Sequence, residues 1–277
     1  MAMNSVVTNH GAIVALQSLN RTTDALSIVQ KRVSTGVRVA DAKDDGGAFA
    51  AALAVRSDTA GLQAVNEQLG GIKGIVETTF ASLGKVSDTM KELRQVVTRL
   101  ADGSTNTEQR TQYNAQFTAL TTQIGTFLDD AKYNGRSLLS TDTAAGGGNI
   151  DVLRNEDAQT FVLTATDGAA VKTALTVPGG FATAAAAATF LTTTFNTQEG
   201  AVATALNRYG TDLKYVENQI TFNADKIDSL NNGLGALVDA DLAKESAKLQ
   251  ALQVRQQLGI QTLGLANQGP QVLLSLF

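Results

Sequence analysis

Few residues of this 277-residue chain are of types that carry out chemistry, and their spacing favours no catalytic site. The sequence has no cysteine and a single histidine, His10. It therefore offers no thiol nucleophile, no thiolate ligand and no pair of histidines. We expect no catalytic residue, no metal, no cofactor and no enzymatic activity.

The remaining polar motifs are better explained as turns and helix caps. Asp44 and Asp45 are adjacent, and adjacent residues do not share a helix face, so a turn or cap is favoured over a metal site. Asp239 and Asp241 precede an apolar helical pattern, which favours an N-cap over a calcium loop. The glycines at 146–148 lack the downstream Lys-Ser/Thr that a phosphate-binding loop requires.

Charge and hydropathy exclude two further classes of function. The 22 basic and 26 acidic residues give a net charge of −4, so no electrostatic footprint for nucleic acid is present. Two long uncharged stretches, Thr173–Gln198 and Gln256–Phe277, are too polar for a bilayer core, so we predict no membrane insertion. No Lys or Arg precedes Arg21 and no long apolar block leads to a small-residue cleavage site, so we expect no cleaved signal peptide.

Heptad repeats of apolar residues indicate which segments of the chain form long helices. Two rows cover 55–100 and hold apolar residues at twelve of fourteen positions, where 43% apolar composition would give about six. This pattern predicts one continuous helix of roughly 69 Å. A second seam covers 202–237 and is broken only by Asn223, and a shorter helix carries Tyr113 to Phe127. We expect these three to form a bundle with a core that includes Leu62, Leu69, Val76, Leu83, Met90, Val97, Leu213, Ile220 and Ile227.

Both ends carry thinner heptads that could pack within the chain or between copies of it. Because so narrow a stripe supports a helix poorly by itself, we expect these ends to become ordered on assembly. The main reason to favour packing between subunits is a resemblance to a known family, which is carried by motifs along the chain. The residues expected to serve self-assembly are Leu19, Leu26, Val29, Val33, Leu242, Leu249, Leu252, Leu263, Leu273 and Leu276. The charged residues Lys244, Glu245 and Lys248 are interpreted as a solvated helix face, with a subunit contact as the alternative.

Between the bundle halves the composition changes to short β-type runs at Ile150–Leu153, Thr160–Ala165 and Val171–Val177. The Ala-rich run from about Thr183 is expected to start the returning helix. The fold class is therefore mainly α: an elongated helical hairpin or bundle, with terminal coiled-coil helices and a small β-containing insert at the distal end. The expected parts are 1–42 and 237–277 (terminal coiled coil), 43–139 and 183–236 (bundle), and 140–182 (outer insert).

Three motifs, in order along the chain, resemble those of bacterial flagellins. Residues 34–45, Ser-Thr-Gly-Val-Arg-Val-Ala-Asp-Ala-Lys-Asp-Asp, are similar to the family's Ser-Ser-Gly-Leu-Arg-Ile-Asn-Ser-Ala-Lys-Asp-Asp. Residues 132–139 resemble its aromatic-Asn-Gly turn, and residues 266–276 resemble its closing motif. The residues that carry the turns of these motifs are Gly36, Arg38, Lys43, Asp44, Asp45, Asn134 and Gly135. The short insert is similar to that of alphaproteobacterial flagellins.

The resemblance implies a structural subunit that polymerises into the flagellar filament and serves swimming motility. It also implies an extracellular location, reached through the flagellar export apparatus with an export chaperone, and contacts with hook-associated junction proteins and the filament cap. A hook–filament junction protein is the alternative, because such proteins share terminal patterns with flagellin. A soluble enzyme and a generic coiled-coil adaptor are the more distant rivals.

Overall fold

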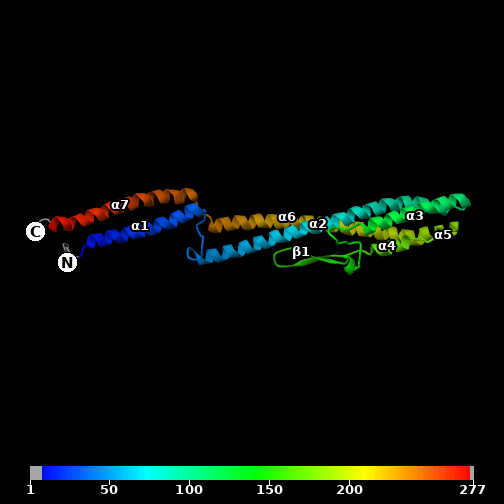
Figure 1. Cartoon of the computed structure of the whole chain (residues 1–277), viewed down its shortest axis with the longest axis horizontal. Coiled ribbons are helices and arrows are strands. Elements are labelled where there is room, and N and C mark those ends of the chain that lie inside the picture. Colours follow the sequence, from blue (N-terminus) through cyan, green and yellow to red (C-terminus); the bar gives the residue numbers. More distant parts are fainter. Residues whose placement is uncertain (1–7, 275–277) are drawn as a thin grey trace. The chain divides into compact units, whose positions relative to one another are not determined.

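The structure, a computed structural model, describes residues 8–274, and the side chains of residues 8–268. Most of the described residues are helical, which confirms the mainly α class (Figure 1). The elements follow in the order α1 (His10–Thr35), α2 (Gly46–Leu100), α3 (Thr107–Asp129), η1 (Thr143–Ala145), β1 (Ile150–Leu153), β2 (Thr160–Leu163), α4 (Gly168–Leu175), α5 (Ala184–Phe190), η2 (Leu191–Phe195, a π-helical segment), α6 (Asn196–Val238) and α7 (Leu242–Leu274).

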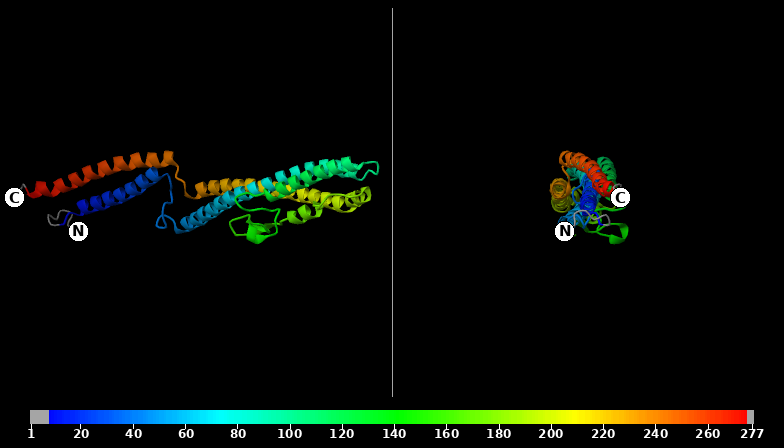
Figure 2. Two further views of the ribbon diagram at one scale, coloured as in Figure 1. Left: turned by 45° about the vertical axis from the view of Figure 1, so that its right-hand side comes forward. Right: turned by 90° about the vertical axis from the view of Figure 1, so that its left-hand side faces the viewer.

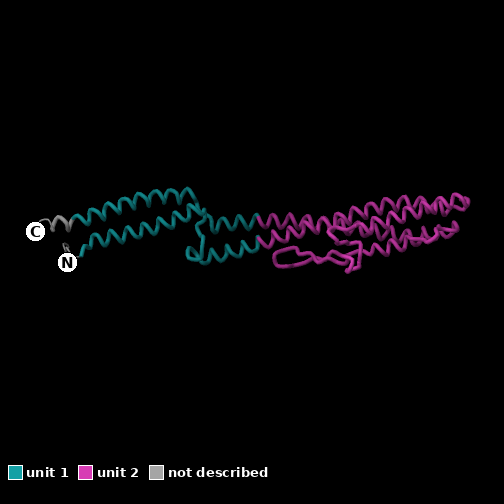
Figure 3. Tube along the Cα trace, in the orientation of Figure 1, with its two compact units in different colours: residues 1–59, 228–277 teal, residues 60–227 magenta. Residues whose placement is uncertain are grey.

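Packing divides the chain into two compact units (Figure 3). The first comprises residues 1–59 and 228–277, and the second comprises residues 60–227. These limits differ from the expected ones, because the contacts of the first unit continue into the beginning of α2 and the end of α6. Residues 140–182, expected as a separate outer insert, belong to the same unit as the bundle.

The core of the second unit is built on α2, which is one continuous helix as its heptads predict. One row of the heptad is at most 2% exposed and comprises Leu62, Leu69, Val76, Leu83, Met90 and Val97. On α6 the buried positions are Val202, Ala205, Tyr209, Val216, Asn223 and Val238. The row chosen from sequence, Leu213, Ile220 and Ile227, is only half-buried beside them.

Caps define the ends of the bundle helices. Asn106 and Gln109 form a capping box at the start of α3, where each side chain accepts a bond from the other's backbone N–H. Thr183 caps α5 by accepting from the backbone N–H of Ala186, which confirms the predicted start of the returning helix.

The insert folds back onto the helices. Strands β1 and β2 pair antiparallel, with Ile150 opposite Leu163, and the inward residues of both strands join the core of the second unit. The third predicted β run is wrong, because residues 168–175 form helix α4. Asp167 accepts a bond from the backbone N–H of Ala170 and so starts this helix, and Val171 and Leu175, one turn apart, are buried.

Candidate functional site

Helices α1 and α7 lie side by side in antiparallel directions within the first unit (Figures 1 and 2). At one end of the pair, the Asn9 side-chain amide donates to the carbonyl oxygen of Ala266 at 2.8 Å. At the other end, Arg32 Nη1 lies 3.8 Å from Glu245 Oε1. We call α1 and α7 the terminal pair.

The residues predicted for self-assembly occupy mainly the seam inside this pair. Leu26 and Val29 are 7% and 6% exposed and face the only helix that α1 contacts appreciably among the described residues, which is α7. Leu19, Val33, Leu249, Leu252 and Leu263 are half-buried, whereas Leu242 is exposed. The side chain of Leu273 is not among those described, and Leu276 lies outside the described residues. The seam expected between subunits is thus largely a contact within one chain.

Apolar side chains outside the predicted seam also remain exposed on the terminal pair. Eight of them, each 46–70% exposed, are together called the exposed terminal face: Ile13, Val14, Leu16, Ile28, Val254, Leu258, Ile260 and Leu265. The heptad rows do not include these residues, so they were not among the residues predicted for self-assembly. Their signal was present, however, since a helix with apolar residues on more than one side needs more than one partner.

The two linkers of the first unit are hydrogen-bonded to each other. Residues 36–45 join α1 to α2, and residues 239–241 join α6 to α7. The backbone N–H of Arg38 donates to the carbonyl of Val238 at 2.7 Å, and the N–H of Ala240 donates to that of Gly36 at 3.0 Å. The Arg38 guanidinium also donates to the carbonyl of Leu237 at 2.7 Å. Both chain segments therefore leave the terminal pair at a common, fixed point.

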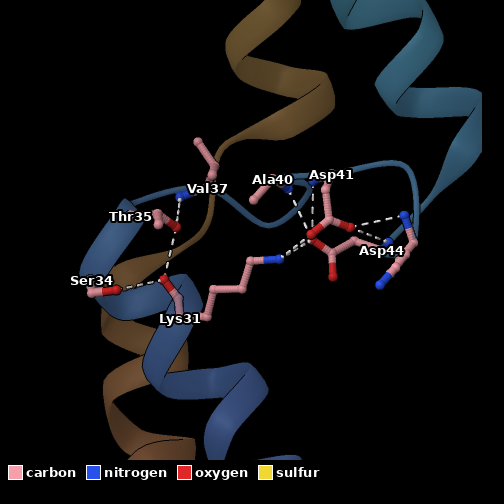
Figure 4. Close-up of polar contacts among 8 residues, drawn as sticks. Lys31, Ser34, Thr35, Val37, Ala40, Asp41 and Asp44 are labelled. Atoms are coloured by element: carbon pink, nitrogen blue, oxygen red, sulfur yellow. Dashed lines mark hydrogen bonds and ion pairs between the residues drawn. The ribbon is translucent and has the colours of Figure 1, made fainter.

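Lys31 of α1 holds the first linker through two carboxylates (Figure 4). Its Nζ lies 2.7 Å from Asp41 Oδ2 and 3.0 Å from Asp44 Oδ2. The Asp44 carboxylate also accepts from the backbone N–H of Ala40 at 3.0 Å. The Lys31 ammonium lowers the pKa of the Asp41 carboxyl, while the Ala40 N–H and then Lys31 lower the pKa of Asp44. These two acids in turn raise the pKa of Lys31.

In the predicted charged cluster Lys244 and Lys248 are exposed as expected, but Glu245 is not. Glu245 was predicted on a solvated face, but it is 6% exposed, because α7 turns this residue toward Arg32 at the end of α1. Its carboxylate also lies 2.8 Å from Lys248 Nζ. Glu245 is therefore a buried carboxylate with one cationic partner on α1 and another on α7.

The described part of the chain holds no cluster of metal-ligating side chains. His10 lies exposed at the start of α1. Among the described residues, no three histidine, cysteine or acidic side chains converge to hold a metal ion. None of the described helices combines the length and apolar character that spanning a membrane requires.

The comparisons with known proteins agree with this arrangement. Residues 6–144 match the model of the bacterial flagellin N-terminal helical region, and residues 196–277 match that of the C-terminal helical region. The chain belongs to the bacterial flagellin family. This flagellin is therefore a structural subunit of the flagellar filament, which is an extracellular organelle of motility.

Individual relatives match along essentially the whole chain. Flagellin FljK of Caulobacter vibrioides is 37% identical, with 100% of both chains covered. Flagellin FljJ of the same organism is 38% identical over 99% of this chain and 98% of that one. A flagellin of Brucella melitensis is 34% identical, with 99% of each chain covered. None of these findings favours a hook–filament junction protein.

In this flagellin the motif residues named from sequence have identifiable structural roles. Gly36 ends α1 with a φ of 72°, a left-handed conformation that glycine adopts without strain. Asp45 accepts from the backbone N–H groups of Gly47 and Ala48 and so starts α2. The backbone N–H of Lys43 donates to Asp41 Oδ1. Asn134 and Gly135 form a two-residue turn with φ values of 48° and 75°, as in a type I′ hairpin.

Proposed function

We propose that this flagellin polymerises through the exposed terminal face, which copies of the chain bury against one another. The observation that carries the proposal is that nine of the described large apolar side chains on α1 and α7, Leu242 and the eight of the exposed terminal face, remain 46–70% exposed after those helices have paired. An apolar surface of this kind on a soluble subunit marks an interaction site. Burying it supplies a free energy of association on the order of 1 kcal/mol per side chain, before entropic costs.

The geometry of such a contact favours a filament over a closed oligomer. The exposed residues lie on two different helices, so the surface of one copy can engage a different surface of the next. Repeated heterologous contact that does not close generates a helical polymer. The half-buried seam residues, such as Leu249 and Leu252, are then completed by neighbouring copies.

Family membership suggests which other flagellar proteins this chain contacts, and its net charge bears on nucleic-acid binding. We expect passage through the flagellar export apparatus with an export chaperone and without a cleaved signal, followed by polymerisation between the hook-associated junction proteins and the filament cap. A net charge of −4 gives no basis for nucleic-acid binding. We expect a purely structural role without catalysis or cofactor.

A pair of substitutions at one position tests the proposal. Ile260→Glu places a charge in the exposed terminal face, where Ile260 is 57% exposed, whereas Ile260→Leu keeps the face apolar. Both variants should fold as monomers with the helicity of the parent chain, because the position does not lie in the core. Under assembly conditions, electron microscopy and pelleting should show filaments with Ile260→Leu and none with Ile260→Glu. Normal filaments from Ile260→Glu would overturn the assignment of this face.

A further inference from the structure

An asparagine stands in the apolar seam between α2 and α6 of the second unit. Asn223 is 0% exposed, although its neighbours in the seam are apolar residues such as Val216. A buried amide costs free energy unless each of its polar atoms finds a partner. The partners of Asn223 therefore show what the residue does.

Every polar atom of the Asn223 side chain is hydrogen-bonded. Its Nδ2 donates to Asn66 Oδ1 on α2 at 3.0 Å and to the carbonyl oxygen of Arg154 at 3.1 Å. Its Oδ1 accepts from Gln219 Nε2 at 2.9 Å, and the same Gln219 amide donates to the Arg154 carbonyl at 3.0 Å. The Asn66 amide donates to the carbonyl of Ile220 at 3.3 Å. One network thus joins α2, α6 and the end of β1.

Two more contacts hold the tip of the β1–β2 hairpin to the same helices. Glu156, in the turn that follows Arg154, forms an ion pair with Lys226 on α6. Gly61 of α2 faces Glu156 so closely that a Cβ added to the glycine would lie 3.2 Å from the Cβ of Glu156. The carbonyl of Arg154 is therefore held at a fixed height along both helices.

Leucine and valine seams do not specify a unique register by themselves. Sliding α6 along α2 by one turn would bring other apolar residues together at a modest cost, because hydrophobic burial is not directional. The amides of Asn66 and Asn223 are satisfied only where they face each other and the Arg154 carbonyl. A single buried polar position is known to fix the register of coiled coils in this way, at some cost in stability.

We propose that Asn66, Asn223, Gln219 and the Arg154 carbonyl form a register lock, which sets the axial position of α6 against α2 and uses the hairpin tip as its third component. The hairpin is then part of the mechanism that aligns the bundle. A chain without it would bury the amides of Asn223 and Gln219 without their shared acceptor.

The test measures two properties of each variant of the full-length monomer: its stability to urea and the register of α6 against α2. Asn223→Leu alone leaves Asn66 Oδ1 without its donor and removes one of the two donors to the Arg154 carbonyl, so its urea midpoint should fall. Asn66→Leu/Asn223→Leu removes the half-buried amide together with the buried one, so its midpoint should return to the parent value or exceed it. Asn66→Ala/Asn223→Ala serves as a second double variant without added volume, and Asn207→Leu, at an exposed position of α6, is the matched control.

Register is measured with a short thiol crosslinker, because the chain has no cysteine of its own. Lys73→Cys/Glu217→Cys reports the native register, since Lys73 Nζ lies 2.9 Å from Glu217 Oε1. Lys73→Cys/Thr221→Cys reports a register shifted by one turn. In the parent chain and with Asn207→Leu, the native pair should crosslink roughly tenfold faster than the shifted pair.

In the double variants that preference should be lost, and amide exchange at Arg154 and Gln159 in the hairpin should accelerate. Retention of the full preference for the native pair in a folded double variant would overturn the register lock. A double variant that is as unstable as Asn223→Leu would also overturn it, because the network would then contribute ordinary stability.

Discussion

The Nη1 atom of Arg32, in the last turn of α1, lies 3.8 Å from the Oε1 atom of Glu245 in the first turn of α7. The Glu245 side chain is 8% exposed and that of Arg32 is 26% exposed, so this is the one strongly buried carboxylate of the described terminal pair. This ion pair ties the end of α1 to the beginning of α7, next to the two linkers.

Arg32→Ala should therefore weaken the terminal pair. The buried carboxylate of Glu245 would keep only Lys248 as a cationic partner, which we expect to cost roughly 1–3 kcal/mol. Amide exchange in α1 and α7 should accelerate, and the urea midpoint should fall. Arg21→Ala, at an exposed position of the same helix, is the control, and an equal loss in both variants would contradict the role of the buried pair.

The contacts of Lys31 should make the first linker sensitive to pH at both extremes. Asp41 and Asp44 have lowered pKa values in the folded chain, so their contribution is complete above about pH 4, the pKa of an unperturbed carboxyl, and is lost as the pH falls below it. The raised pKa of Lys31 has the opposite sign, so its contribution is complete below about pH 10 and is lost as the pH rises through the folded value.

The measurement is the difference in melting temperature between the parent chain and Lys31→Met across the pH range. We expect a plateau at neutral pH and a decline at each extreme. Lys43→Met, at an exposed position of the linker, should give no such profile. A difference that does not vary with pH would show that Lys31 acts only through its aliphatic stem.

Tyr209→Phe should destabilise the second unit without changing its shape. Tyr209 is fully buried, and its hydroxyl lies 2.9 Å from the carbonyl of Leu138 and 3.1 Å from that of Thr164. Removing it takes one donor from these two carbonyls, at a cost of roughly 1 kcal/mol in urea denaturation. Tyr215→Phe is the control, because Tyr215 is 36% exposed; the proposal fails if both variants lose the same stability.

Asn106→Ala should loosen the start of α3. The variant removes one half of the capping box with Gln109, which we expect to cost about 1 kcal/mol. The loss should be accompanied by faster amide exchange in the first turn of α3. Gln116→Ala, at an exposed position further along that helix, should leave both unchanged.

The long helices could be predicted from the sequence because their signal is local. The heptads of 55–100 place Leu62 and Leu69 on one side whatever packs against them, and the structure has one helix there. Asn223 could be recognised only as a break in its seam. Its acceptor is the carbonyl of Arg154, 69 residues earlier, and no periodicity encodes such a contact.

The errors have the same physical origin. The Val171–Val177 run has β-type composition, but the Asp167 cap and the one-turn spacing of Val171 and Leu175 made it a helix in this environment. At the chain ends, a heptad identifies one seam and not the partner that fills it. The pattern therefore could not distinguish the seam within the chain from the exposed terminal face, which carries Ile260 and Leu265.

Because α1 and α7 leave apolar side chains exposed, the stability of these two helices should depend on protein concentration. A contact that forms only between folded terminal pairs stabilises them by mass action, so each tenfold rise in free subunit above the dissociation constant adds about 1.4 kcal/mol per site. The order of the chain ends thus becomes a function of subunit concentration. Dilute and crowded populations of the same molecule should differ most at α1 and α7 and least around Tyr209, whose partners all belong to its own chain.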